Sequence, residues 1–197
     1  MSTVYEKNDT ARYTYADYLV WDTEERYELL DGEAYMLSAP TVTHQAVSRE
    51  LIGQFGNFLK GKSCQVFAAP FDVRLFPRED GGDDTVVQPD LLVVCDKSKI
   101  ADNRACRGAP DLVIEILSPS NDGPAMFLKY NRYLTAGVRE YWVISPETRE
   151  IQVHILDRGD ENISNRYIST LYTGAAALGV SVLPGLNVDF NTIWSEL

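Results

Sequence analysis

The sequence contains few of the residues that bridge small secreted proteins or bind transition metals. Its 197 residues include two histidines and three cysteines, Cys64, Cys95 and Cys106. The cysteines are odd in number and lack C-x-x-C spacing, so they predict neither a disulfide framework nor a structural zinc site. Free thiols are typical of a reducing compartment, and we therefore expect a cytoplasmic protein. Two histidines without an H-E-x-x-H motif exclude a histidine-rich zinc hydrolase.

Positive charge and long apolar runs are also scarce. The chain has 18 basic and 29 acidic residues, a net charge of −11, which excludes a large basic surface for non-specific binding to nucleic acid or anionic membrane. No apolar run approaches the ~20 residues that a membrane-spanning helix needs. Residues 1–17 are polar and lack the apolar core of a signal peptide. We therefore expect no membrane partner, and only local contacts to any nucleic acid.

The residues that are present have the composition of an ordinary globular domain. Hydrophobic residues make up 45% of the chain and charged residues 24%. A chain of this length can bury one core without metal or disulfide bridges. We expect a lead-in over residues 1–26 and a single domain over residues 27–197. Within the domain, β-forming residues flank Asp31-Gly32, which predicts an N-terminal β-hairpin over Tyr27–Met36.

Two main helices are predicted from apolar periodicity and from end signals. Apolar residues recur every three or four positions over residues 43–60, with Thr43 as the N-cap. A second helix is expected over residues 124–136, with Asp122 as a possible cap and a glycine directly after its end. Shorter helices are expected near residues 15–21 and 190–197.

The remaining regular segments are expected to be strands. The run Leu112–Leu117 is apolar on both faces apart from one carboxylate, the pattern of a central strand that is covered on both sides. Together these elements predict an α/β (α+β) class with a central mixed β-sheet flanked by helices. The other strands are expected over residues 65–69, 71–76, 86–94, 139–144, 150–156, 166–171 and 180–183.

Three charged residues stand out by their position. Glu115 lies in the apolar strand, where an ionised carboxylate costs several kcal/mol unless it is paired, protonated or bound to metal. Asp90 follows Pro89 in a run of β-formers. Lys129 lies in the second helix. Taken singly, Glu115 fits a buried ion pair, Asp90 a turn, and Lys129 a solvated surface position.

Taken together, these three residues indicate phosphate chemistry. Two carboxylates from neighbouring strands supply the hard oxygen ligands that Mg²⁺ prefers and leave positions for water and a substrate phosphate. A nearby ammonium can orient the attacking water or neutralise charge in the transition state.

The order of the motifs resembles a known family. Pro89-Asp90 is followed by Glu115–Ser120, by Lys129–Tyr133 and by Ala136–Val143. This set is similar to the Uma-two type restriction endonucleases, which are abundant in cyanobacteria and belong to the PD-(D/E)XK nuclease superfamily. The similarity begins near Tyr27 and extends to the segment Leu183-Pro184-Gly185-Leu186, so it covers most of the chain. It implies a restriction-endonuclease-like fold.

The resemblance assigns roles to individual residues. It implies that Asp90 and Glu115 are the metal ligands, with the backbone carbonyl of Ile116 as a third, and that Lys129 is the catalytic lysine. In the parent pattern the lysine lies two residues after the glutamate, where this chain has Leu117. In this family the lysine lies on the next helix. The implied cofactor is Mg²⁺, with Mn²⁺ as a substitute.

Glu33 and His44 are accessory candidates on the same grounds. Glu33 is expected either as a further metal ligand or as a surface residue of the hairpin, and His44 as a capping or hydrogen-bonding residue near the site. Four residues before the lysine the family usually has an aspartate, where this chain has Ala125. Asp122 is a possible substitute.

These features predict a Mg²⁺-dependent DNA endonuclease that hydrolyses phosphodiester bonds. Two alternatives remain open: a catalytically degenerate nuclease fold that serves as a binding or assembly module, and a metal-dependent phosphoesterase acting on RNA or small phosphates. The family resemblance implies a homodimer. A local basic rim for DNA is expected from five arginines: Arg74, Arg104, Arg107, Arg132 and Arg139.

Overall fold

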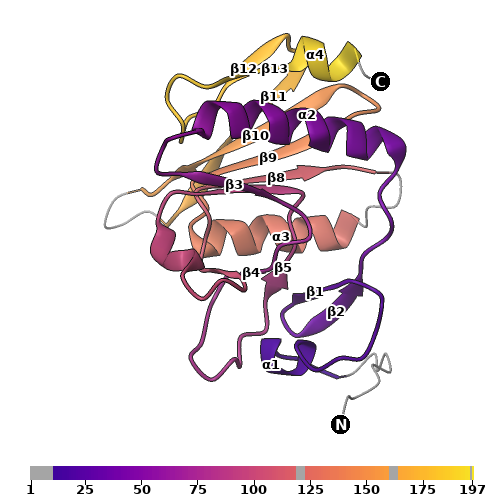
Figure 1. The fold of residues 1–197 in the computed structure, drawn as a ribbon, viewed down its shortest axis with the longest axis vertical. Coiled ribbons are helices and arrows are strands. Elements are labelled where there is room, and N and C mark those ends of the chain that lie inside the picture. Colours follow the sequence, from indigo (N-terminus) through magenta and orange to yellow (C-terminus); the bar gives the residue numbers. More distant parts are fainter. Residues whose placement is uncertain (1–10, 119–122, 160–163, 196) are drawn as a thin grey trace.

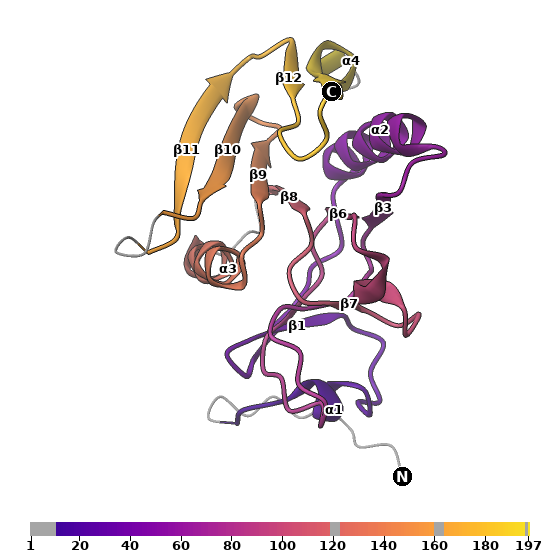
Figure 2. The same ribbon diagram turned by 90° about the vertical axis from the view of Figure 1, so that its left-hand side faces the viewer.

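The computed structural model describes residues 11–118, 123–159, 164–195 and 197. They form a six-stranded sheet, a five-stranded sheet and a two-stranded sheet. The two long helices, over residues 42–59 and 123–136, lie on opposite faces of the six-stranded sheet (Figures 1 and 2). The five-stranded sheet lies on the same side of the six-stranded sheet as the second of these helices. The predicted class, with a mixed central sheet flanked by helices and an N-terminal hairpin, is confirmed.

The six-stranded sheet has the order β11-β10-β9-β8-β6-β3. The pair β8–β9 is parallel, and the other neighbours are antiparallel. The helix α3 (Gly123–Ala136) forms the crossover that a parallel pair requires. The strands are β3 (Gln65–Ala68), β6 (Leu91–Val94), β8 (Leu112–Ile116), β9 (Glu140–Ser145), β10 (Glu150–Asp157) and β11 (Arg166–Thr173).

Both faces of this sheet are buried. The helix α2 (Val42–Leu59) packs Leu51 and Phe55 into a core that includes Ile114 of β8. On the other face, α3 packs into a second core that includes Val113 of the same strand. Because successive side chains of a strand point to opposite faces, Glu115 shares the α3 face with Val113.

The five-stranded sheet has the order β2-β1-β5-β4-β7 and contains the predicted hairpin. Asp31 and Gly32 form its turn, both with positive φ, at 53° and 80°. The strands are β1 (Tyr27–Leu30), β2 (Glu33–Met36), β4 (Val73–Arg74), β5 (Val86–Val87) and β7 (Cys106–Arg107). The short elements outside both sheets are α1 (Tyr15–Tyr18), the 3₁₀ helix η1 (Lys97–Ile100), the β12 (Ala177–Gly179) and β13 (Asn187–Asp189) pair, and α4 (Phe190–Ser195).

Several predicted element boundaries were wrong. The N-cap of α2 is Thr41, whose hydroxyl accepts from the His44 amide at 3.2 Å, and not Thr43. The expected strand over residues 86–94 is divided between the two sheets at Gln88-Pro89-Asp90, since proline cannot donate to a ladder. Residues 180–183 form a turn between β12 and β13, where the Leu183 amide donates to the Val180 carbonyl.

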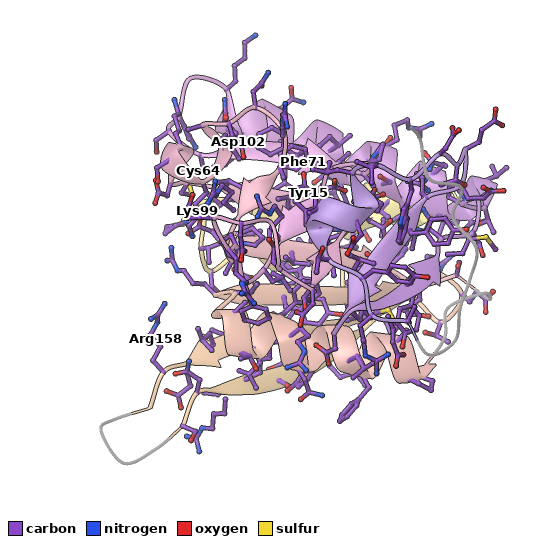
Figure 3. All side chains as sticks on the ribbon, turned by 90° about the horizontal axis from the view of Figure 1, so that it is seen from below. Tyr15, Cys64, Phe71, Lys99, Asp102 and Arg158 are labelled. Carbon is purple, nitrogen blue, oxygen red and sulfur yellow. A yellow bond between two sulfur atoms is a disulfide. The ribbon has the colours of Figure 1, made fainter. Side chains whose placement is uncertain are left out.

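The expectation that the three cysteines are free was also wrong. Cys64, directly before the edge strand β3, and Cys95, directly after its neighbour β6, form a disulfide with an S–S distance of 2.08 Å (Figure 3 labels Cys64). Cys106 is free and buried. A separate finding concerns membranes: within the part of the chain that the structure describes, no helix has both the length and the apolar character to cross one.

Candidate active site

The predicted site residues meet in one cavity between the two sheets and α3. The cavity has a volume of about 200 Å³, and it is lined by Asp90, Glu115, Ile116, Lys129 and His44. These residues come from β8, α2, α3 and the segment between β5 and β6. Residues up to 85 positions apart in the sequence, from His44 to Lys129, therefore share one small space.

Glu115 and Lys129 form a buried ion pair. Glu115 projects from β8 toward α3, and the Lys129 Nζ lies 2.8 Å from its Oε1. Tyr133, one helical turn after Lys129, donates its hydroxyl to the same oxygen at 2.7 Å. The Glu115 carboxylate thus has a cation and a hydroxyl on Oε1, which satisfies the pairing requirement of a charge in an apolar strand.

A second carboxylate, from β1, shares the same lysine. The Oε1 of Glu28 lies 2.8 Å from the Lys129 Nζ and accepts the backbone N–H of Gln88 at 2.7 Å. Only 3% of Glu28 is exposed. One ammonium therefore joins the small sheet, through Glu28, to the large sheet, through Glu115.

Asp90 lies where the chain passes from the small sheet to the large one. Its Oδ2 accepts the backbone N–H of Ile116 at 2.7 Å, and its Oδ1 lies 3.1 Å from the His44 Nε2. These two contacts hold the Asp90 carboxylate at the end of β8, beside Glu115. His44 belongs to the first turn of α2, so this helix also positions the carboxylate.

The local charges shift the pKa values of these groups in directions that follow from burial and pairing. Burial raises the pKa of Glu115, with Asp90 and Glu28 adding to the effect and Lys129 opposing it. Burial opposes the charge on Lys129, but the carboxylates of Glu115 and Glu28 outweigh it and raise its pKa, so it stays protonated. For His44, burial is outweighed by the hydrogen bond and charge of Asp90, and the pKa is raised.

The donor chemistry fits Mg²⁺. Among the described residues no group of three or more His, Cys, Asp or Glu side chains is arranged to hold a metal ion. The expected set is smaller, with two carboxylates and one backbone carbonyl, and Mg²⁺ is commonly held by one or two carboxylates together with water and substrate phosphate. Gln88 also lines the cavity, and its Oε1 is buried with no hydrogen-bond partner in the described chain.

The charged side chains of the cavity also bear on cation binding. Three carboxylates and two basic side chains, Arg26 and Lys129, line it. At a pH above the raised pKa values of His44 and Glu115, one negative charge is left unbalanced, and this favours a bound cation.

The accessory candidate Glu33 does not lie in this cavity. It sits beside the hairpin turn, paired with Leu30, and its carboxylate contacts Arg12 at 2.9 Å with 48% of the side chain exposed. Glu28 is two residues farther along β1 from the turn than Leu30, and it is the hairpin glutamate that reaches the site. Asp122, the expected substitute for the missing aspartate, lies outside the described residues.

Four of the five arginines expected to form a basic rim are paired with carboxylates, and the fifth, Arg104, is exposed. Arg74 is buried and its guanidinium lies 2.6 Å from the Asp83 carboxylate. Three other arginines form ion pairs with carboxylates at or near the surface. These pairs neutralise the cations that were expected to contact DNA, because each faces an acidic side chain from its own neighbourhood. The pairs are Arg107–Glu79, Arg132–Asp31 and Arg139–Asp111.

Sequence reasoning missed Glu28 and Tyr133 as site residues. The signal for Glu28 was present: like Glu115, it is a carboxylate inside an otherwise apolar strand. Tyr133 follows Lys129 by four residues, so both side chains lie on one face of a helix. Gln88 carried no such signal, since its place in the site depends on the passage of the chain between sheets.

Comparisons with known proteins identify the family and the fold. A family model described as "Uma2: Putative restriction endonuclease" matches residues 15–191. The "Uncharacterized protein slr1290" of Synechocystis sp. (strain ATCC 27184 / PCC 6803 / Kazusa) is 27% identical over 155 residues, which are 76% of this chain and 77% of that protein.

A solved structure from Anabaena variabilis ATCC 29413, described as a "putative nuclease belonging to DUF820", is similar in fold. Its TM-score is 0.71 at 20% sequence identity, and the match covers 93% of this chain and 98% of that chain. The arrangement of the two sheets and helices is therefore that of a nuclease-like fold.

Proposed function

Because the chain belongs to the Uma2 family, whose description names a restriction endonuclease, we propose that it is a Mg²⁺-dependent DNA endonuclease that hydrolyses phosphodiester bonds. One observation carries the proposal: a protonated lysine lies 2.8 Å from each of two buried carboxylates. A third carboxylate, Asp90, lines the same cavity. This combination suits a reaction in which a cation and an ammonium share the charge of a phosphate.

Each residue has a proposed role. Asp90, Glu115 and the carbonyl of Ile116 would hold the metal, which supplies Lewis-acid polarisation of the phosphate and a lowered pKa of bound water. Lys129 has three N–H donors, and its Nζ lies 2.8 Å from both Glu28 and Glu115; the third donor would bind a phosphate oxygen or the attacking water. Glu28 is a positioning residue, since it acts through Lys129. His44 orients Asp90.

DNA is proposed as the substrate on the family relationship and on this chemistry. The surface offers little general attraction to a duplex, because the net charge is −11 and four of the five expected rim arginines are paired. Contacts to the substrate are therefore concentrated in the cavity, where Arg26 lies beside the catalytic groups. We propose the cytoplasm on the ground that a nuclease shares a compartment with its substrate, since the Cys64–Cys95 disulfide removes the argument from free thiols.

A second candidate function is favoured by the same ion pair. A degenerate nuclease fold would neutralise Glu115 with a protein cation, and Lys129 does contact Glu115 directly. In that case the domain would act as a binding or assembly module and would take up no divalent ion.

A calorimetric titration of Mg²⁺ and Mn²⁺ into the wild type and Glu115→Gln separates the two functions. For the nuclease we expect binding by the wild type and at least a tenfold loss in the variant, because one of two carboxylate ligands is removed. A wild type that takes up no ion at millimolar concentration, with or without a non-hydrolysable oligonucleotide, contradicts the nuclease and supports the module.

A cleavage assay on single-stranded, duplex and RNA substrates then identifies the reaction, with Lys129→Ala as the inactive control. Cleavage of RNA or small phosphates but not of DNA would favour the phosphoesterase alternative over the DNA endonuclease.

We also propose the homodimer that the family implies, since two sites can cut two strands. Sedimentation equilibrium should give twice the chain mass of 22.1 kDa, and a monomer mass at micromolar concentration would contradict it.

A further inference from the structure

A second hollow adjoins the catalytic cavity on the same face of the large sheet. It has a volume of about 630 Å³ and lies between α3 and the strands β9 and β10. In Figure 2, α3 is seen nearly end-on beneath these strands. We call it the aromatic groove. Its lining residues are Leu117, Ser118, Gly123, Met126, Phe127, Tyr130, Tyr141, Val143, Gln152 and His154.

The groove and the catalytic cavity are neighbours. Ser118 and Met126 line both. Across the sheet, Glu115 pairs with Val143, and Val143 pairs with Gln152. Since neighbouring strands lie about 4.8 Å apart, the floor of the groove begins one strand from the catalytic glutamate. This separation is comparable to that between a phosphate and a base of one nucleotide.

The chemistry of the groove is that of a base site and not of a phosphate site. No Asp, Glu, Lys or Arg is among its described lining residues. Phe127 is 68% exposed at its edge, and the Tyr130 ring lies 5.1 Å from His154 in an edge-on arrangement. Exposed or partly exposed aromatic rings of this kind provide faces for stacking.

Two polar side chains of the groove can contribute hydrogen bonds to a base, and Tyr141 can do so only when the groups that cover its hydroxyl move aside. The Tyr141 hydroxyl is buried and has no hydrogen-bond partner among the described residues, although only 1% of the residue is exposed. An unsatisfied buried hydroxyl is costly and its retention calls for an explanation. Gln152 contributes an exposed amide, which can pair with the edge of a base.

We infer that the aromatic groove binds an unpaired nucleobase adjacent to the scissile phosphate. The inference rests on the proposed nuclease function and deepens it, because it makes the substrate single-stranded or locally unpaired nucleic acid. Stacking supplies affinity that a surface with paired arginines does not supply through phosphate contacts. A base that is paired within a duplex cannot enter a groove between a helix and a sheet without leaving its stack.

Matched hexanucleotides test the inference directly. The probes are fluorescein-labelled hexathymidylate, a hexamer of abasic residues with the same charge, and a hairpin duplex, measured by anisotropy in EDTA so that no hydrolysis occurs. We expect hexathymidylate to bind at least about tenfold tighter than the abasic hexamer, the lower range of one stacked base, and tighter than the duplex. Equal affinities for the first two probes overturn the inference.

Variants locate the effect. Phe127→Ala removes the exposed ring. Tyr141→Phe removes only the unpartnered hydroxyl, and because no hydrogen bond is lost, this variant should unfold at the same temperature as the wild type or at a higher one. The controls are Ile168→Ala and Tyr172→Phe on β11, whose side chains lie on the opposite face of the sheet. We expect both groove variants to reduce the preference for bases and both controls to preserve it. A preference that persists in both groove variants contradicts the assignment.

The outcome is separable from that of the proposed function. If the wild type binds Mg²⁺ and cleaves DNA but binds both hexamers equally, the proposed nuclease function stands and the assignment of the groove as a base site is overturned. A wild type that prefers hexathymidylate but takes up no divalent ion loses the nuclease function, and the groove then belongs to a binding module.

Discussion

At the scale of single residues, the chemistry of the cavity depends on Lys129. Its ammonium lies 2.8 Å from both Glu28 and Glu115, and 6% of the residue is exposed. The same contacts serve stability and function. They hold two buried carboxylates that would otherwise lack a cation, and they fix the ammonium at the wall of the cavity in which the phosphate is proposed to bind.

Replacing the lysine should therefore affect both properties. We expect Lys129→Met to lower the free energy of unfolding by about 3 kcal/mol or more, because it leaves buried carboxylates without a cation. Cleavage should fall by about 100-fold or more, as for the loss of one transition-state donor. Urea denaturation and nicking of DNA measure the two effects. The exposed Lys97→Met is the control, and an equal loss in both variants would contradict the assignment.

The two glutamates of the hairpin provide a matched pair at this scale. Glu28→Gln removes a charge that positions Lys129, and we expect cleavage to fall by about 100-fold, the typical effect of a small displacement of a catalytic group. Glu33→Gln alters an exposed pair with Arg12 and should leave cleavage within a factor of two (about the assay error) because surface pairs contribute little. The reverse order of effects would restore Glu33 as the site residue.

At the scale of elements, the ends of helices and the pairing of strands place the site residues. The helix α2 begins at Val42, and its first turn contains His44, which contacts Asp90. The N-cap thus contributes to the position of a proposed metal ligand. On the opposite face, α3 carries Lys129 and Tyr133 toward Glu115.

The cap can be tested by two neighbouring threonines. Thr41→Ala removes the hydroxyl that accepts the His44 amide and should destabilise the protein by about 1 kcal/mol. Thr43→Ala lies within the helix and should change stability little, since alanine has the higher helix propensity. Thermal unfolding of the two variants gives the comparison, and a larger loss for Thr43→Ala would place the cap where the sequence pattern put it.

The cysteines offer a second test of element placement. Cys64, directly before β3, and Cys95, directly after β6, form a disulfide, and burial raises the pKa of Cys106 to about 12. At pH 8 we therefore expect no thiol of the native protein to react quickly with a maleimide. Unfolding without reductant should expose one thiol, and unfolding with reductant three. Three reactive thiols after unfolding without reductant would show that the bridge does not form.

At the scale of the whole molecule, the ion pairs of the cavity connect the two sheets. Glu28 belongs to the small sheet and Glu115 to the large one, so the shared lysine couples them. The family relationship drawn from the ordered motifs is confirmed by the match over residues 15–191. The extent of the folding unit, residues 27–197, is a proposal that this coupling supports.

Two tryptophans report on the two sheets, Trp142 from within that unit and Trp21 from the lead-in directly before it. Trp21 packs against Tyr27 of β1, with ring centroids 5.4 Å apart, and Trp142 is buried in the core of the large sheet. If residues 27–197 unfold as one domain, fluorine NMR of 5-fluorotryptophan-labelled protein should give the same urea midpoint for both. Midpoints that differ by more than about 0.5 M, a substantial part of the stability given typical m-values, would divide the chain into two units.

The sequence by itself determined the class of the fold, the hairpin, the central strand with its carboxylate, and the candidates Asp90, Glu115 and Lys129. These features depend on local periodicity, turn chemistry and the cost of an unpaired charge, all of which are visible in a few neighbouring residues. The resemblance, which rests on the order of the motifs, added the expected roles of these residues.

Only the tertiary structure decided which groups meet. The choice of Glu28 over Glu33, the place of Gln88, the pairing of the arginines with carboxylates and the Cys64–Cys95 bridge all depend on which segments lie side by side. Such contacts join residues far apart in the chain, and their geometry follows from the packing of two sheets around α3. Local patterns carry no information on that packing, because the same strand or charge pair is compatible with many partners until the layers are assembled.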